Sequence, residues 1–305
     1  MKKNQLRGSL CLLIGTLIWG FAFIAQSVGM DHLGPFTFQA LRCLLAVVFL
    51  ILCSFLMDIG KCSFWESFAK WKNPKLWKVG VICGCALFVA ASLQQFGIIY
   101  TDAGKAGFLT AMYIVLVPVL GLFLGKKPPI TTLPSVALAV AGLYLLSCMG
   151  VSQVNKGDLF LMGCALAFAV QITCIDRLAG DLDGLRLNCV QSLVVALLSL
   201  PFVALTETVT MDGILACWLP LCFAGILSMG VAYTLQIVGQ KDLDPAAASL
   251  IMSLESVFAA LGGWAILHET MTNWELLGCA LVFMGVLVSQ IPVKPRRECC
   301  PDCTQ

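Results

Sequence analysis

The chain has 305 residues, of which 59% are hydrophobic and 12% are charged, and its formal net charge is +2 at pH 7. An ordinary globular protein is roughly 45–50% apolar and about 25% charged. Here 19 basic and 17 acidic side chains cannot cover a water-soluble fold of this size. The composition therefore predicts a multi-span membrane protein and excludes a soluble enzyme, a nucleic-acid-binding protein and a disordered scaffold.

Ten segments meet the requirement for a membrane-spanning helix, which is about 20 mostly apolar residues. They cover residues 8–28, 36–57, 76–99, 104–124, 131–149, 157–176, 186–205, 214–238, 245–267 and 273–291. The first segment is long enough to span and no clear small-x-small cleavage site follows it, so we expect it to be retained. The sequence predicts an all-α integral membrane protein with ten transmembrane helices, and Pro118 is expected to kink the fourth.

A short amphipathic stretch separates the second and third segments. Phe64, Trp65, Phe68 and Trp71 recur there at helical spacing, with charged residues among them. Such a pattern is typical of a helix that lies on the membrane interface with its aromatic rings at headgroup level. A helix that binds a partner protein is the alternative.

The placement of Lys and Arg predicts the orientation. If the N-terminus is cytoplasmic, sixteen of the 19 basic residues lie on the cytoplasmic side, including those of 61–78 and 294–297. Only Lys105 and Lys156 then lie outside, and Arg42 lies within the second segment. We therefore expect a multi-pass protein of the plasma membrane with both termini in the cytoplasm, which requires an even number of helices.

The sequence contains an internal repeat. Residues 8–50 align with 157–199 at a constant shift of 149, and a shift of 141 places Trp77 on Trp218 and Gln95 on Gln236. The chain is thus divided into a five-helix repeat at 8–149, a second at 157–291 and a short cytoplasmic tail at 292–305. Because five is odd, the second repeat enters the membrane from the opposite face. Inverted repeats are typical of secondary transporters, whose substrate site lies near the membrane midplane.

Several short motifs occur in the same order as in a known transporter family. They are Leu17-Ile18-Trp19-Gly20, Phe36-Thr37-Phe38-Gln39-Ala40-Leu41-Arg42, Leu254-Glu255-Ser256-Val257-Phe258-Ala259-Ala260-Leu261 and His268-Glu269. In these motifs and in their order the chain resembles the EamA family of the drug/metabolite transporter (DMT) superfamily, which is built from two five-helix EamA repeats. It departs from the family pattern at Ser256, where proline is usual, at His268, where glycine is usual, and at Gly125-Lys126-Lys127, where many members carry Gly-Glu.

The resemblance implies a plasma-membrane carrier of small metabolites, often an exporter of amino acids. It also implies that helices 1, 3, 4, 6, 8 and 9 surround a central cavity. The expected partners are the lipid bilayer and a small-molecule substrate, with protons as a candidate coupling ion. An intramembrane enzyme or a lipid-handling protein is the alternative, but neither a convergent catalytic set at membrane depth nor a nucleotide-binding motif is visible in the sequence.

Two ionisable residues stand out because charges at membrane depth are costly and usually functional. Arg42 lies about 9 Å, and Glu255 about 15 Å, from the nearer membrane face at 1.5 Å rise per residue. Each is a candidate either for a structural contact, such as an ion pair between the two, or for substrate binding and coupling. Glu255 can exchange a proton or bind an amino group, and Arg42 can bind a substrate carboxylate.

Polar and aromatic residues near these charges complete the predicted site. The candidates for substrate binding are Gln95, Gln236, Glu255, Trp19, Tyr113 and Gln171. We expect no catalytic residue, cofactor or metal site. Cys300 and Cys303 in the tail have a C-x-x-C spacing, but further ligands are missing there, so an unstructured tail is favoured over lipidation or metal sensing.

Overall fold

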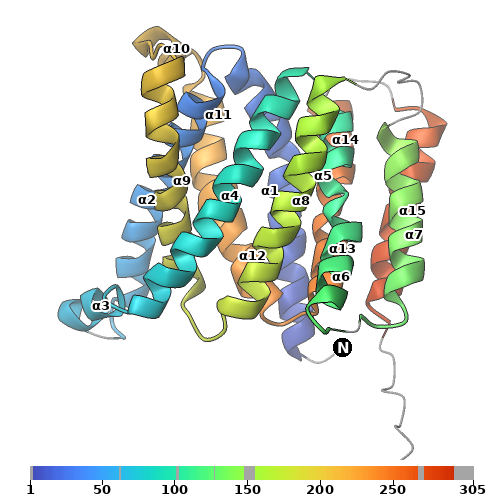
Figure 1. Ribbon diagram of the computed structural model, residues 1–305, viewed down its shortest axis with the longest axis horizontal. Helices are drawn as coiled ribbons and strands as arrows, with labels where there is room; N and C mark the ends of the chain where they lie inside the picture. Colours follow the sequence, from blue (N-terminus) through green and yellow to red (C-terminus); the bar gives the residue numbers. More distant parts are fainter. Residues whose placement is uncertain are drawn as a thin grey trace, which may run out of the picture.

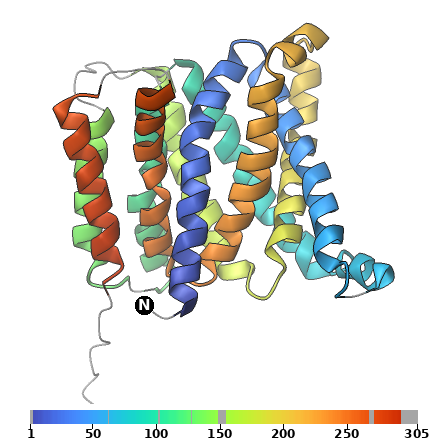
Figure 2. The same ribbon diagram turned by 180° about the vertical axis from the view of Figure 1, so that it is seen from behind.

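The fold was analysed in a computed structural model, which describes residues 3–61, 63–100, 103–126, 128–147, 155–266 and 271–291. The tail at 292–305 and the His268-Glu269 pair therefore lie outside the described residues. All regular structure within the described ranges is helical. The helices stand side by side as a bundle, with α1 (Lys3–Met30) in its middle (Figures 1 and 2).

The described helices follow the predicted segments closely. The first half contains α1, α2 (Pro35–Asp58), α3 (Phe64–Lys70), α4 (Pro74–Tyr100), α5 (Ala103–Ala111), α6 (Tyr113–Phe123) and α7 (Thr132–Ser147). The second half contains α8 (Lys156–Leu178), α9 (Gly184–Thr206), α10 (Met211–Ala216), α11 (Trp218–Cys222), the π-helix η1 (Phe223–Ala232), α12 (Tyr233–Gln240), α13 (Pro245–Met252), α14 (Leu254–Ile266) and α15 (Asn273–Ser289). Eight stretches are long and apolar enough to cross a membrane, and α7 and α15 supply two shorter apolar helices. The prediction of an all-α membrane protein with about ten helices is confirmed.

Two of the predicted segments are each divided into two helices. The segment 104–124 is interrupted at Met112, between α5 and α6, and the segment 245–267 at Ser253, between α13 and α14. At the second break the Ser253 hydroxyl binds the Leu250 carbonyl at 2.8 Å, so a side chain takes an acceptor of the helix ladder. Pro118, where a kink is expected, lies inside α6, six residues after the break at Met112. The two breaks are 141 residues apart, which is the second of the two shifts found in the sequence repeat.

The predicted amphipathic helix is present as α3, at the end of the bundle where the N-terminus lies (Figure 1). Ser63 and Glu66 form a capping box at its start, and these hydrogen bonds hold the pKa of Glu66 below its ordinary value. Phe64 and Trp65 are exposed, as the rings of an interfacial helix would be before they meet lipid.

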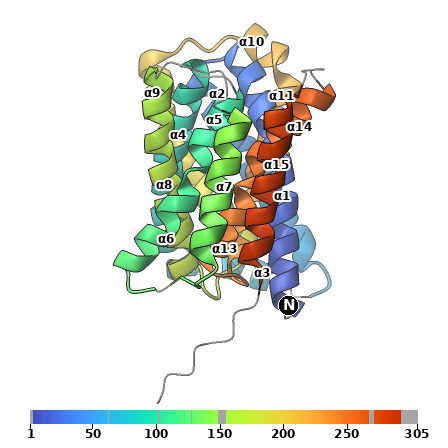
Figure 3. The same ribbon diagram turned by 90° about the vertical axis from the view of Figure 1, so that its right-hand side faces the viewer.

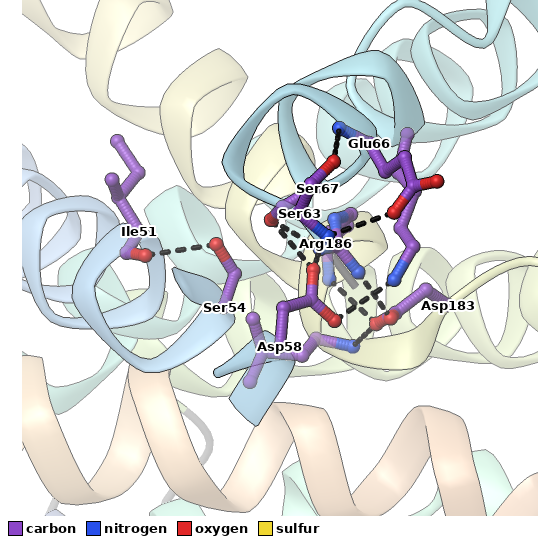
Figure 4. Close-up of polar contacts among 10 residues, drawn as sticks. Ile51, Ser54, Asp58, Ser63, Glu66, Ser67, Asp183 and Arg186 are labelled. Carbon is purple, nitrogen blue, oxygen red and sulfur yellow. Dashed lines mark hydrogen bonds and ion pairs between the residues drawn. The ribbon is translucent and has the colours of Figure 1, made fainter. Parts of the chain in front are cut away.

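The antiparallel helices α2 and α9 are connected at both ends by a carboxylate. At one end, Asp58 accepts hydrogen bonds from Ser67 Oγ at 2.6 Å, Lys70 Nζ at 2.9 Å and Arg186 Nη2 at 2.5 Å (Figure 4). Arg186 is buried in the first turn of α9, where Asp183 also binds it at 2.6 Å. This contact connects the last residue of α2 to the start of α9.

At the other end, Glu207 directly follows α9 and covers the start of α2. Its Oε1 accepts the Phe36 N–H at 2.9 Å, and its Oε2 accepts the Thr37 N–H at 2.7 Å and the Thr37 hydroxyl at 2.6 Å. A Cβ on Gly34 would overlap this carboxylate, so glycine leaves the room that Glu207 occupies. The two contacts use residues that the sequence repeat, at its shift of 149, places in equivalent positions. Asp58 and Glu207 are 149 residues apart, and so are Thr37 and Arg186. We call the two contacts the α2–α9 end contacts.

The peripheral pair α7 and α15 packs with its backbones in close contact (Figure 3). A Cβ built on Gly142 would lie 2.6 Å from the Gly278 carbonyl oxygen, and a Cβ on Gly278 would lie 2.6 Å from that of Gly142. Any larger residue at either position would push the helices apart. Glycine is therefore required here for close approach, as in other membrane helix pairs with small residues at the interface.

The Glu207 contact predicts a measurable contribution to stability. Glu207→Gln removes the negative charge at the N-terminus of α2 and leaves one carbonyl oxygen for three donors, so unfolding should become easier by about 1–2 kcal/mol, the range for loss of a helix cap. Thermal unfolding of the purified protein in detergent checks this. Asp31→Asn, the same change at an exposed carboxylate before α2, is the control and should not change the midpoint. Equal shifts in both variants would contradict the role of Glu207.

Candidate functional site

A cavity between the two halves of the chain contains most of the predicted site residues. The empty space inside it is about 480 Å³, a figure that includes space open to solvent. It is lined by Trp19, Phe23, Gln26, Arg42, Gln94, Tyr113, Phe168, Ile172, Ser228, Tyr233, Gln236, Met252 and Glu255. These residues come from the six helices that the family resemblance implied and also from α2, which contributes Arg42.

The helix breaks at Met112 and Ser253 position one side of the cavity. Tyr113 is the first residue of α6 and Glu255 the second of α14, so each follows a break directly. The Tyr113 hydroxyl donates a hydrogen bond to Glu255 Oε1 at 3.0 Å. Glu255 is 6% exposed and lies in the first turn of α14, where the positive end of the helix dipole favours a carboxylate. Such half-helix ends are the usual ligand sites of transporters with discontinuous helices.

Arg42 approaches the cavity from α2 and is only 3% exposed. Its Nη1 donates to Gln26 Oε1 at 2.6 Å, and its guanidinium lies 5.8 Å from the centre of the Phe38 ring. Gln26 Oε1 also accepts a hydrogen bond from Gln95 Nε2 at 3.1 Å, which fixes the amide in place. Three helices, α1, α2 and α4, thus hold one guanidinium.

The ion pair that was considered between Arg42 and Glu255 does not form. Within the described part of the chain, neither residue has an oppositely charged group within 4.0 Å. The cavity wall therefore contains one positive and one negative side chain that are held apart by separate neutral partners, Gln26 and Tyr113. Buried charges that have no ionic partner are costly, and they commonly mark the path of a ligand.

The predicted glutamines divide between the wall and the layer behind it. Gln236 lines the cavity and donates to Gln171 Oε1 at 3.2 Å, while Gln171 is fully buried behind it. Gln94 rather than the predicted Gln95 faces the cavity, because neighbouring residues on a helix point about 100° apart. Gln95 lies behind the wall, where it supports Gln26. In each half, a glutamine of the third span thus binds a glutamine of the first.

Aromatic rings form much of the remaining wall. Trp19 and Tyr233 pack edge to face with ring centres 4.9 Å apart, and Tyr113 and Phe168 do so at 6.4 Å. Trp19 is therefore a lining residue, as predicted, and its Nε1 has no hydrogen-bond partner within the described structure. Tyr233 was not predicted, because nothing in the sequence around it distinguishes it from a packing residue.

A π-helical segment provides another part of the wall. Ser228 lines the cavity from η1, which extends over ten residues where π-helices usually last one turn. Asn188 Nδ2 compensates by donating to the carbonyls of Met229 at 2.8 Å and Gly230 at 2.9 Å. Asn188 therefore supports the irregular helix and does not line the cavity.

Two further residues of the site were missed. Gln26 orients Arg42 and lines the cavity, and its signal was an amide within the first apolar segment. Ser228 has no comparable signal in the sequence. The lining contains no histidine or cysteine, and the described residues contain no group of three His, Cys, Asp or Glu side chains that could hold a metal ion. The arrangement is suited to binding a small solute through charges, amides and aromatic rings.

The chain is similar to known membrane transporters. The EamA-like transporter family matches the chain twice, at residues 6–148 and 155–290. An uncharacterized transporter of Archaeoglobus fulgidus is 31% identical over 95% of this chain and 88% of its own length. The threonine/homoserine exporter RhtA of Escherichia coli is 32% identical over 52% of this chain and 54% of its own.

A solved crystal structure of a protein superposes with a TM-score of 0.77 at 19% identity and covers 93% of this chain and 96% of that one, which shows a shared fold. The family matches extend over almost all described residues, including every helix that lines the cavity. The protein is a multi-span membrane protein, and it belongs to the EamA-like transporter family.

Proposed function

We propose that the protein is a secondary carrier that exports small metabolites such as amino acids across the plasma membrane by alternating access. The observation that carries the proposal is the cavity itself. It lies among apolar helices, is lined by residues of both halves of the chain and contains Arg42 and Glu255, which have no ionic partner among the described residues. The similarity to RhtA, a threonine/homoserine exporter by name, supports amino acids as substrates and export as the direction.

We further propose that residues 8–149 and 157–291 are inverted repeats that move relative to each other. Three observations support this organisation. The family model matches the chain twice, once in each half. The two helix breaks are 141 residues apart, and the carboxylates of the two α2–α9 end contacts are 149 residues apart, which are the two shifts of the sequence repeat. Because α2 and α9 run antiparallel, equivalent residues lie at opposite ends of the bundle. A pseudo-two-fold axis in the membrane plane would relate the halves, with the cavity between them.

The basic residues support a cytoplasmic N-terminus. The short helix α3 and the starts of α4 and α9, which carry Lys70, Lys75 and Arg186, lie at the end of the bundle where α1 begins (Figure 1). The start of α5, which carries Lys105, lies at the other end. This distribution follows the positive-inside rule. The alternative of an intramembrane enzyme receives no support from the part of the chain that the structure describes.

Transport should be detectable in proteoliposomes. With the purified protein reconstituted, vesicles preloaded with an unlabelled amino acid should accumulate the labelled one faster than protein-free vesicles, because a carrier exchanges solute across the membrane. A panel of amino acids and other small metabolites identifies the substrate. If no member of a broad panel is exchanged, the proposal fails.

Protons are the proposed coupling ion, and Glu255 is the proposed group that exchanges them. A pH gradient should then drive net uptake by the wild type. Glu255→Gln keeps the shape and removes the titratable proton, so this variant should still exchange substrate at high concentration but no longer respond to the gradient. Glu207→Gln makes the same change outside the cavity and should keep the response. If Glu255→Gln remains driven by the gradient, the coupling role is wrong.

The orientation predicts the outcome of reporter fusions. A green fluorescent protein fused after Lys72 should fluoresce and an alkaline phosphatase there should be inactive, because the connection between α3 and α4 is proposed to be cytoplasmic. Fusions after Asn155, just before α8, should give the reverse result. The same reporter active at both positions would contradict the proposed topology.

A further inference from the structure

We infer that the cavity binds a zwitterion through two separate poles: Arg42 binds the carboxylate and Glu255 binds the ammonium group of a neutral α-amino acid. This inference rests on the proposed transport function and adds which atoms recognise the substrate. It follows from the contacts of the two charged residues, from the balance of charge in the wall and from the uncharged character of the remaining lining.

Arg42 can bind an anion, because most of its hydrogen-bond donors are unused in the described part of the chain. A guanidinium has five N–H donors, and within the described structure only Nη1 forms a hydrogen bond, to Gln26. Gln26 is in turn held by Gln95, so the guanidinium is oriented by a chain of amides that carry no charge. A carboxylate is the partner that the planar fork of an arginine binds best.

Glu255 is arranged as the opposite pole. Its carboxylate has about four acceptor positions, and within the described structure it accepts one hydrogen bond, from Tyr113. The start of α14 supports the negative charge through the helix dipole. An ammonium group donates three hydrogen bonds and carries the charge that this carboxylate lacks nearby.

The balance of charge selects a zwitterion over an ion of one sign. The lining has one positive and one negative side chain. A simple anion would neutralise Arg42 and leave Glu255 buried with no ionic partner, and a simple cation would do the reverse. A zwitterion that reaches both residues neutralises both, which removes the cost of two buried charges at once.

The rest of the lining selects the side chain. Trp19, Phe23, Phe168 and Met252 are apolar or aromatic, and Gln94, Ser228 and Gln236 are polar but uncharged. A third charge on the ligand would find no opposite charge in this lining. The cavity is therefore expected to bind amino acids with uncharged side chains and to reject lysine and glutamate.

The test compares amino acids with analogues that lack one pole. L-leucine is matched with 3-methylbutylamine, which lacks the carboxylate, and 4-methylpentanoate, which lacks the amino group. L-threonine and L-phenylalanine are matched in the same way, and L-lysine and L-glutamate are added. Affinities for the purified full-length protein are measured from the rise of the thermal unfolding midpoint with ligand concentration. We expect at least one neutral amino acid to bind at least tenfold more tightly than either of its analogues, and than lysine or glutamate.

Two variants should each abolish the preference for one charged group of the ligand. Arg42→Gln should weaken the amino acid and the acid at least tenfold and leave the amine unchanged. Glu255→Gln should weaken the amino acid and the amine at least tenfold and leave the acid unchanged. Both should fold, because each removes a buried charge that has no ionic partner in the described structure. Arg7→Gln and Glu207→Gln make the same changes outside the cavity and should leave every affinity within twofold.

Other outcomes overturn the inference. If a variant weakens the amino acid, amine and acid by the same factor, its residue is structural. If an analogue with one pole binds as tightly as the amino acid, the zwitterion is not selected. Should a glutamine variant fail to fold, Tyr113→Phe and Gln26→Met keep both charges and remove their orienting bonds. The first should weaken the amino acid and amine, the second the amino acid and acid. Exchange of other metabolites without binding of any amino acid would refute the inference and leave the carrier function standing.

Discussion

Polar groups inside a bilayer must find their partners within the protein, and this constraint explains most irregular features of the structure. In three places a side chain takes over a backbone partner. Asn188 binds carbonyls of the π-helix η1, Ser253 binds a carbonyl at the break before α14, and Glu207 binds free N–H groups of α2. The π-helix η1 and the break before α14 both adjoin the cavity, to which they contribute Ser228 and Glu255.

The two proposed repeats share structural features but differ in the charged residues that they contribute to the cavity. Features that recur at the repeat shift, such as the helix breaks and the α2–α9 end contacts, fix the shape of the bundle. The charges of the cavity do not recur, since Arg42 corresponds to Gln191 and Glu255 to Ile114. A symmetric scaffold can support two equivalent states that open to opposite sides. The unequal residues then distinguish one ligand from another.

The sequence predicted those parts of the molecule that depend on local hydropathy and spacing. The spans, the short amphipathic helix and the buried charges Arg42 and Glu255 were visible because an apolar run or a charge within one is a local signal. The breaks at Met112 and Ser253 and the π-helix were not visible, because hydropathy does not report helical register. The choice between Gln94 and Gln95 depends on the rotation of α4 against its neighbours. The end contacts join residues separated by up to 171 positions, which no local pattern encodes.

The contact between Glu207 and the start of α2 also has a consequence for biosynthesis. Phe36 and its partner are 171 residues apart, so α2 is made long before the carboxylate that covers its first turn. At about 5–20 residues per second, the ribosome needs about 9–34 s to reach Glu207. During that time the N–H groups of Phe36 and Thr37 are without this carboxylate, and water at the membrane surface can satisfy them. The first turn of α2 is therefore capped only late in translation, by the second half of the chain.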